Sequence, residues 1–217
     1  MNDILNKFSN IGIIPVVVLD SAEDAVPLGR TLCDGGLACA EVTFRTDAAK
    51  ESIKRMAKEF PDMLIGAGTI LTIQQVDEAV EAGAKFIVSP GINPKVVDYC
   101  VKNNIPITPG CANPTNVETA LEFGLEVVKF FPAEPAGGLP YIKAISAPYN
   151  KVKFIPTGGI NAVNVKEYLA YDRILACGGS WMVKSELVKS HDFDKIKELT
   201  EEAVAIRDEI YKEKLNK

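Results

Sequence analysis

The segment LEVVKFFP, Leu125–Pro132, is a largely apolar run that carries one lysine, Lys129, near its middle. Such a run predicts a strand that is buried on both faces, as parallel strands covered by helices usually are. An ammonium group placed there loses hydration, so burial favours the neutral amine. A neutral amine is the nucleophile that forms a Schiff base with a carbonyl compound. Two alternatives stay open: Lys129 reaches water at a strand end, or it pairs with Glu126 or Glu134.

The length and composition of the chain predict one globular domain that spans residues 1–217. Of the 217 residues, 47% are hydrophobic and 24% are charged, which is typical of globular proteins. The formal net charge of -5 opposes a nucleic-acid partner or an anionic membrane surface, because both require a basic face. An anionic metabolite would have to be held by individual Arg and Lys side chains and by helix N-termini.

The cysteines and the single histidine predict neither disulfides nor a metal site. The cysteine number is odd, and no CxxC or Cys/His cluster occurs. We interpret His191 as a surface or capping residue. The N-terminus is too polar for a signal peptide, and no apolar stretch reaches the roughly 18 residues that span a bilayer. We therefore expect a cytoplasmic protein. The cysteines are Cys33, Cys39, Cys100, Cys111 and Cys177.

Short β-rich runs alternate with helical segments along the whole chain, which predicts a parallel sheet with crossover helices. Eight strands are expected, and eight is the number of the (β/α)8 TIM barrel. An open doubly wound sheet would usually place a glycine-rich turn after its first strand, where this chain has Leu19-Asp20. The expected strands are Ile13–Val18, Cys39–Phe44, Met63–Gly68, Lys85–Pro90, Ile105–Gly110, Glu126–Phe131, Lys153–Gly158 and Arg173–Gly179.

Amphipathic segments between these strands predict the crossover helices. Thr72 followed by Gln75 fits a capping box. An extra helix over about the first eight residues is expected to plug the bottom of the barrel, and a last helix near Phe193–Lys214 is expected to pack outside it. The remaining helices are expected at Ala22–Cys33, Ala48–Glu59, Ile73–Ala82, Pro94–Lys102, Asn113–Glu122, Leu139–Ile145 and Asn161–Ala170.

Polar residues at the carboxyl end of the second expected strand are candidates for catalysis, since barrel active sites lie at that end of the strands. Alternation puts Glu41, Thr43 and Arg45 on the interior side. A carboxylate beside the desolvated amine of Lys129 can move protons during imine chemistry. The alternative is a purely structural ion pair, although such pairs stabilise weakly. Arg45 could bind a carboxylate with its guanidinium fork, or form a surface salt bridge with Asp47.

Two glycine pairs predict a phosphate-binding site. PTGGIN, Pro156–Asn161, follows the seventh expected strand, and CGGSW, Cys177–Trp181, follows the eighth. Many barrels hold a phosphate at this position on backbone N–H groups and the N-terminus of a short helix, which we expect to open at Ser180. Each pair alone is a weak signal, because glycine also serves plain turns. Together they indicate a phosphorylated ligand.

The motifs taken in chain order resemble the family of 2-keto-3-deoxy-6-phosphogluconate (KDPG) aldolase, which includes bifunctional enzymes that also cleave 4-hydroxy-2-oxoglutarate (KHG). The resemblance runs from about Ile11 to Val183, and KFFPAE with PTGGI is its most specific part. The motifs are EVTFRT at Glu41–Thr46, GAGT at Gly66–Thr69, SPG at Ser89–Gly91, KFFPAE at Lys129–Glu134, PTGGI at Pro156–Ile160 and GGSW at Gly178–Trp181.

The resemblance implies a metal-independent class I aldolase of the Entner–Doudoroff pathway, without a cofactor, acting as a cytoplasmic homotrimer. Lys129 would form the imine with the keto carbon, and Glu41 would act as acid and base. The substrate would be the phosphorylated keto-deoxy sugar acid, and pyruvate and glyceraldehyde 3-phosphate the products. The residues implied to bind substrate are Arg45 and Thr69 at the carboxylate, Pro90 and Phe131 at the pyruvyl group, and Thr157, Gly158, Gly159, Gly179 and Ser180 at the phosphate.

One position departs from the family pattern. Some relatives carry an arginine after the first strand, in a VLR pattern, where this chain has Leu19-Asp20. Several other functions stay open. The enzyme could prefer KHG or 2-keto-3-deoxy-6-phosphogalactonate. A phosphate-binding barrel isomerase could use Glu41 as a carbon-acid base, and a sensing protein could retain the site only to bind its ligand.

Overall fold

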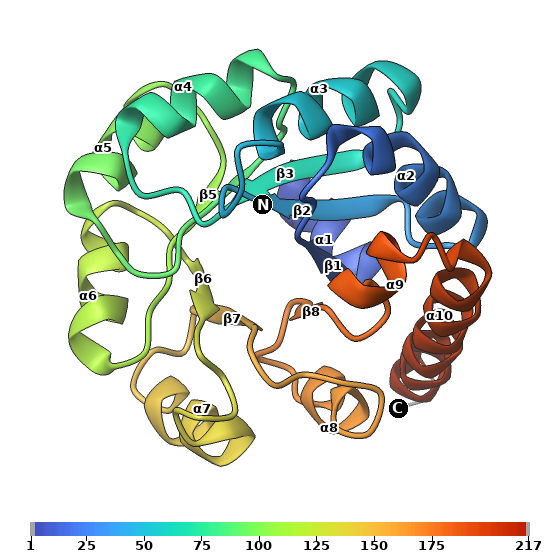
Figure 1. Cartoon of the computed structure of the whole chain (residues 1–217). Coiled ribbons are helices and arrows are strands. Elements are labelled where there is room, and N and C mark those ends of the chain that lie inside the picture. Colours follow the sequence, from blue (N-terminus) through green and yellow to red (C-terminus); the bar gives the residue numbers. More distant parts are fainter. Residues whose placement is uncertain (1–2, 216–217) are drawn as a thin grey trace.

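The structure is a computed structural model that describes residues 3–215. Its elements alternate strand and helix in the order expected from the sequence (Figure 1). The strands are β1 Ile13–Val17, β2 Cys39–Thr43, β3 Leu64–Gly68, β4 Ile87–Val88, β5 Ile107–Thr108, β6 Val127–Phe130, β7 Lys153–Pro156 and β8 Cys177–Gly179. The helices are α1 Asp3–Ile11, α2 Ala25–Asp34, α3 Ala49–Glu59, α4 Ile73–Glu81, α5 Pro94–Lys102, α6 Pro114–Glu122, α7 Gly138–Ser146, α8 Val165–Ala170, α9 Ser185–Lys189 and α10 Phe193–Leu215, with a 3₁₀ turn at Ala22–Asp24.

The strands are parallel and curl about a common axis, with the crossover helices outside them (Figure 1). Six strands form one sheet in the order β5-β4-β3-β2-β1-β8, and β6 pairs with β7 in a second sheet. Single parallel bridges join the two sheets: Gly110 with Lys129 on one side, Phe154 with Ile174 and Thr157 with Gly178 on the other. The expected α/β fold with a curled parallel sheet is therefore confirmed.

Capping residues explain where several helices begin. The expected capping box is present, because Thr72 accepts from the Gln75 N–H and the Gln75 side chain accepts from the Thr72 N–H. Asn93 and Asn113 cap the next two helices, and each is followed by a proline at the first helical position. Proline suits that position because it lacks an N–H that would have no partner there.

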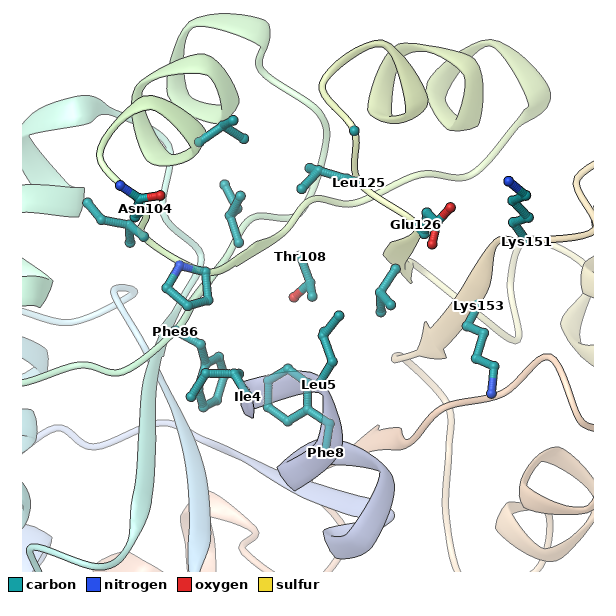
Figure 2. Close-up of a pocket in the computed structure, with 16 residues that line it drawn as sticks. Ile4, Leu5, Phe8, Phe86, Asn104, Thr108, Leu125, Glu126, Lys151 and Lys153 are labelled. Carbon is teal, nitrogen blue, oxygen red and sulfur yellow. The ribbon is translucent and has the colours of Figure 1, made fainter. Parts of the chain in front are cut away.

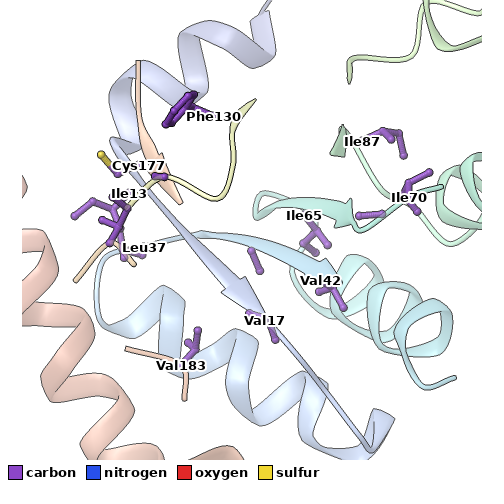
Figure 3. Packing of buried hydrophobic residues seen from close by; sticks show 14 of the residues in the cluster. Ile13, Val17, Leu37, Val42, Ile65, Ile70, Ile87, Phe130, Cys177 and Val183 are labelled. Carbon is purple, nitrogen blue, oxygen red and sulfur yellow. The ribbon is translucent and has the colours of Figure 1, made fainter. Parts of the chain in front are cut away.

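Two clusters of buried apolar side chains hold the strands in place. The larger cluster lies between the strands and the surrounding helices, and Figure 3 shows members from neighbouring strands such as Val17, Val42 and Ile65. The smaller cluster fills the inside of the curled sheet at the amino-terminal ends of the strands. Phe8 of α1 packs there edge-on against Phe86, with ring centroids 4.8 Å apart. The sheet interior is therefore closed by side chains below the level of Lys129.

Two expected helix starts are wrong. The first crossover does begin at Ala22, as a 3₁₀ turn that runs into α2, but α8 begins at Val165 rather than at Asn161. Asn161 and Asn164 form local side-chain bonds instead, since the Asn161 N–H donates to Asn164 Oδ1 at 2.9 Å. The helix expected at Ser180 begins at Ser185, because a turn follows β8 in which the Val183 N–H donates to the Ser180 carbonyl.

His191 lies on the surface, as expected. Its side chain is 66% exposed, and Nε2 lies 2.9 Å from Asp24 Oδ1. Among residues 3–215, no helix combines the length and the apolar character that crossing a bilayer requires.

Candidate active site

A cavity of about 330 Å³ lies at the carboxyl ends of the strands. All eleven residues expected from the sequence to form the site line it. They are Glu41, Arg45, Thr69, Pro90, Lys129, Phe131, Thr157, Gly158, Gly159, Gly179 and Ser180. These residues come from six different crossover units, so the curl of the sheet is what brings them together.

Lys129 and Glu41 face each other inside this cavity. The Nζ atom of Lys129 donates to Oε1 of Glu41 at 3.1 Å, although the two residues are 88 positions apart in the chain. Lys129 is 5% exposed and Glu41 is 3% exposed. The lysine therefore does not reach water at a strand end. It pairs with Glu41, and neither Glu126 nor Glu134 forms an ion pair with it within the described part of the chain.

The surroundings hold this pair at close range. Gly68 of β3 pairs in register with Thr43, and a Cβ atom at Gly68 would stand 2.2 Å from Glu41 Oε1, so glycine at this position leaves room for the carboxylate where it now lies. On the other side, the Nζ of Lys129 lies 5.4 Å from the centre of the Phe131 ring. An aromatic face attracts a cation without accepting a proton from it. Glu41 is the group placed to exchange a proton with the amine.

Arg45 is held by a neighbouring side chain that the sequence reasoning left out of the site. Its Nε donates to Thr43 Oγ1 at 3.2 Å, and the Thr43 hydroxyl donates to the Val17 carbonyl at 2.9 Å. The terminal nitrogens of the guanidinium then remain available for a carboxylate. The alternation of side chains along β2 had already placed Thr43 on the interior side. That placement was the sequence signal from which its contact with Arg45 could have been predicted.

The two glycine loops, after β7 and after β8, line the cavity with backbone atoms. Gly158 and Gly159 have φ of 99° and 85°, a left-handed conformation that glycine adopts without strain. Across residues 3–215, no acceptor engages the backbone N–H of Gly159 or that of Ser180. The Thr157 hydroxyl is buried with no hydrogen-bond partner among the described residues. Donors left free in this way at the wall of a cavity suit an anionic ligand.

The loop Pro156–Gly159 (PTGG) is held in place by contacts with the segment that carries Glu134. The Ala133 and Glu134 N–H groups donate to the carbonyls of Thr157 and Gly158 at 2.8 Å and 3.0 Å. The Glu134 carboxylate accepts from the hydroxyl of Tyr168, a buried residue of α8. Burial, and after it the bond to Glu134, raises the pKa of Tyr168, so the hydroxyl stays protonated and donates. This contact directs the Glu134 carboxylate toward Tyr168.

A buried amine in contact with a carboxylate, at the carboxyl ends of curled parallel strands, is the arrangement expected of an enzyme that forms an imine with its substrate. Comparison with known proteins agrees with this class. The family described as "KDPG and KHG aldolase" matches residues 4–199. The chain therefore belongs to the KDPG and KHG aldolase family, which confirms the resemblance inferred from the motifs.

Individual relatives are similar over nearly their whole length. The 2-dehydro-3-deoxy-phosphogluconate aldolase of Treponema pallidum is 49% identical over 95% of this chain and 98% of its own. The KHG/KDPG aldolase of Escherichia coli is 41% identical over 88% of this chain and 90% of its own. The KDPG aldolase of Legionella pneumophila, solved with pyruvate captured as a covalent carbinolamine intermediate, superimposes with a TM-score of 0.89 at 42% identity, covering 92% and 97% of the two chains. The predicted class, a Schiff-base lyase, is confirmed.

Proposed function

We propose that this enzyme cleaves 2-keto-3-deoxy-6-phosphogluconate to pyruvate and glyceraldehyde 3-phosphate, with Lys129 as the nucleophile and Glu41 as the proton carrier. The observation that carries the proposal is the 3.1 Å contact between Lys129 Nζ and Glu41 Oε1 inside a cavity lined by unpaired donors. KDPG belongs to the Entner–Doudoroff pathway of carbohydrate metabolism, so we place the enzyme there.

The reaction follows from the chemistry of the amine. Lys129 gives up a proton to Glu41 and attacks the keto carbon to form a carbinolamine, which loses water and becomes a protonated imine. The imine withdraws electrons from the adjacent carbon–carbon bond. Removal of the proton from the hydroxyl beyond that bond breaks it, releasing glyceraldehyde 3-phosphate and leaving an enamine. The enamine takes up a proton, and hydrolysis then frees pyruvate and Lys129.

Each end of the substrate has a counterpart in the cavity. Arg45 and Thr69 would hold the carboxylate, while Pro90 and Phe131 would enclose the pyruvyl group. Thr69 has φ of 60°, a strained conformation for a residue other than glycine that is common in functional sites. The free N–H groups of the glycine loops would bind the phosphate, together with the hydroxyls of Thr157 and Ser180. Because no helix begins at Ser180, a helix N-terminus does not contribute at that position.

The phosphorylated substrate is favoured over KHG because these free donors line the cavity and suit a phosphate, which KHG does not carry. Asp20 occupies the position of the arginine in some relatives. Its carboxylate pairs with Lys189 of α9 at 2.8 Å. We infer that Asp20 fastens α9 to the end of β1 instead of contacting substrate.

The proposal also includes the complete barrel and the oligomeric state of the enzyme. A single (β/α)8 barrel over residues 1–217, with an N-terminal helix below it, is supported by the bridges that join the two sheets. A cytoplasmic homotrimer is supported by membership of the family alone.

The deciding assay measures pyruvate release, coupled to lactate dehydrogenase, for KDPG, KHG and the phosphogalactonate analogue, each with and without EDTA. We expect the highest kcat/KM for KDPG and no effect of EDTA. A higher kcat/KM for either other acid contradicts the substrate assignment, and lost activity in EDTA contradicts metal independence.

Thr43→Val should raise KM for KDPG by about five- to tenfold, within the roughly 0.5 to 1.5 kcal/mol that one intramolecular hydrogen bond contributes, with a smaller change in kcat. Valine matches threonine in shape but cannot accept from Arg45, so the guanidinium is no longer held against the carboxylate site. Steady-state kinetics check the result. An unchanged KM would show that Arg45 does not depend on Thr43.

Tyr168→Phe should raise KM for KDPG about three- to tenfold by releasing the Glu134 brace, and should leave KHG kinetics unchanged because KHG has no phosphate. The matched control is Tyr171→Phe, since the Tyr171 hydroxyl bonds to Ser146 outside the site. Equal losses for both substrates would indicate general destabilisation instead of a role at the phosphate loop.

A further inference from the structure

The interior of the curled sheet is closed at the amino-terminal ends of the strands. Leu5 and Phe8 of α1 lie there beside Phe86, in one apolar cluster (Figure 2). The cavity of about 590 Å³ at this end shares no lining residue with the catalytic cavity. A substrate therefore approaches Lys129 from the carboxyl ends of the strands, where the loop Thr157–Ile160 after β7 forms part of the cavity wall.

Asn164 occupies the position before α8 but does not cap that helix. At the same position before α5 and α6, Asn93 and Asn113 accept a hydrogen bond from a backbone N–H of the first turn. Such a contact stabilises the start of a helix. The side chain of Asn164 makes no hydrogen bond of this kind with the described residues of α8. It is directed instead toward the loop that precedes the helix.

Asn161 and Asn164 use both ends of their side-chain amides, and we call them the asparagine pair. Oδ1 of Asn164 accepts from the Asn161 N–H, and Oδ1 of Asn161 accepts from the Val163 N–H, both at 2.9 Å. The two Nδ2 groups donate to one atom, the carbonyl oxygen of Gly159, at 3.1 Å and 3.0 Å. Each amide oxygen faces an N–H and each amide nitrogen faces a carbonyl, so the four contacts are mutually consistent.

The Gly159 carbonyl does not need these donors because of burial. Gly159 is exposed, and an exposed carbonyl can bond to water. What Gly158 and Gly159 require is restraint of the backbone, since glycine loses more conformational freedom on ordering than any other residue. Two side-chain donors on one exposed carbonyl supply that restraint.

The bound carbonyls also determine where the N–H groups of this loop point. In a trans peptide the N–H and the C=O point in opposite directions. The Glu134 N–H binds the Gly158 carbonyl, and the asparagine pair binds the Gly159 carbonyl. The N–H groups of Gly159 and Ile160 are therefore directed away from these donors. Gly159 and Ile160 line the catalytic cavity, whereas the donors do not. Across residues 3–215, neither of these two N–H groups has an acceptor.

We propose that Asn161 and Asn164 position the loop after β7 so that the N–H groups of Gly159 and Ile160 donate to the phosphate of the substrate. The inference rests on the proposed function, since it requires that this loop binds a phosphate. Neither asparagine contacts the substrate, because both act through the Gly159 carbonyl. They contribute to the affinity for a phosphorylated substrate and not to the chemistry at Lys129.

Steady-state kinetics of the variant Asn161→Ala/Asn164→Ala, with KDPG and with KHG, test this role. KM for KDPG should rise on the order of tenfold, from the loss of two hydrogen bonds to one carbonyl, while kcat stays nearly constant. KM for KHG should not change, because KHG has no phosphate. The inhibition constant of glycerol 3-phosphate against KDPG should rise by the same factor as KM.

Asn113→Ala is the matched control. It removes an asparagine from the start of α6, where the side chain does cap the helix. This variant should have a lower melting temperature, because a helix cap is lost. Both KM values should remain those of the wild type, so a loss of stability alone is distinguished from a loss of loop positioning.

Asn164→Asp keeps the test valid if the double variant does not fold. Its carboxylate still accepts from the Asn161 N–H but has no N–H for Gly159, so KM for KDPG should rise about two- to tenfold. Relative to the wild type, this rise should persist at high ionic strength, where repulsion between the new charge and the phosphate is screened. A rise that disappears at high ionic strength would contradict the positioning role.

The two levels of the account fail in different ways. If the wild type favours KDPG over KHG and the variants keep the same preference, or if KM rises equally for both substrates, the role of the asparagine pair is overturned while the proposed function stands. If the wild type itself does not favour KDPG and glycerol 3-phosphate does not inhibit it, the proposed function is contradicted and this inference with it.

Discussion

Replacing Lys129 by methionine abolishes pyruvate release from KDPG, with kcat lower by at least about 10⁴-fold, the scale seen when an enzyme loses its nucleophile. Methionine keeps the length of the side chain but cannot form the imine, so bond cleavage loses its electron sink. The coupled pyruvate assay checks the result. An isomerase that uses Glu41 as a carbon-acid base would keep its activity in this variant.

The stability of the variant needs a separate measurement, because Lys129→Met leaves Glu41 buried without its cationic partner. Breaking a buried pair costs about 3 to 5 kcal/mol. The double substitution Lys129→Met/Glu41→Gln removes the stranded charge and should recover much of the free energy of unfolding, while activity stays lost. Lys85→Met, an exposed lysine just before β4, is the matched control and should change neither quantity.

Replacing Glu41 by glutamine should lower kcat by about 10² to 10⁴-fold, the usual contribution of a positioned acid–base group. The amide still accepts a hydrogen bond from Lys129 but cannot carry protons. Imine formation, dehydration of the carbinolamine and protonation of the enamine should all slow, whereas KM should change little, because Glu41 is not assigned to substrate binding.

Pre-steady-state kinetics distinguish this role from a structural one. In Glu41→Gln, the covalent complex with pyruvate should form slowly but reach the same final amount. If the complex formed at the normal rate, Glu41 would be only a structural partner of Lys129. If the complex did not form and the protein stayed folded, Glu41 would be needed to hold the amine in place.

The fold and most of the site were predictable because they depend on local patterns. The alternation of side chains along the second strand placed Glu41 on the interior side. Lys129 stood out as the single lysine in an apolar strand. The carboxyl ends of the strands indicated where along the barrel axis the site lies. These rules and the family resemblance together selected eleven candidate residues, and all of them line one cavity although their chain positions span Glu41 to Ser180.

What the sequence did not show depends on contacts between distant segments. Gly68 matters because β3 lies beside β2 and brings Glu41 within reach of a Cβ atom. The bond from Tyr168 to Glu134 joins α8 to the segment after β6. The helix expected at Ser180 was wrong because a turn separates β8 from α9, and no propensity of GGSW distinguishes a turn from a helix start.

The most direct test of the account is reduction with borohydride in the presence of pyruvate, followed by peptide mass spectrometry. The account predicts a lactyl-sized increase in mass on the peptide that contains Lys129, with no increase on other lysines and none in Lys129→Met. An unmodified protein, or a modification on a different lysine, would contradict it.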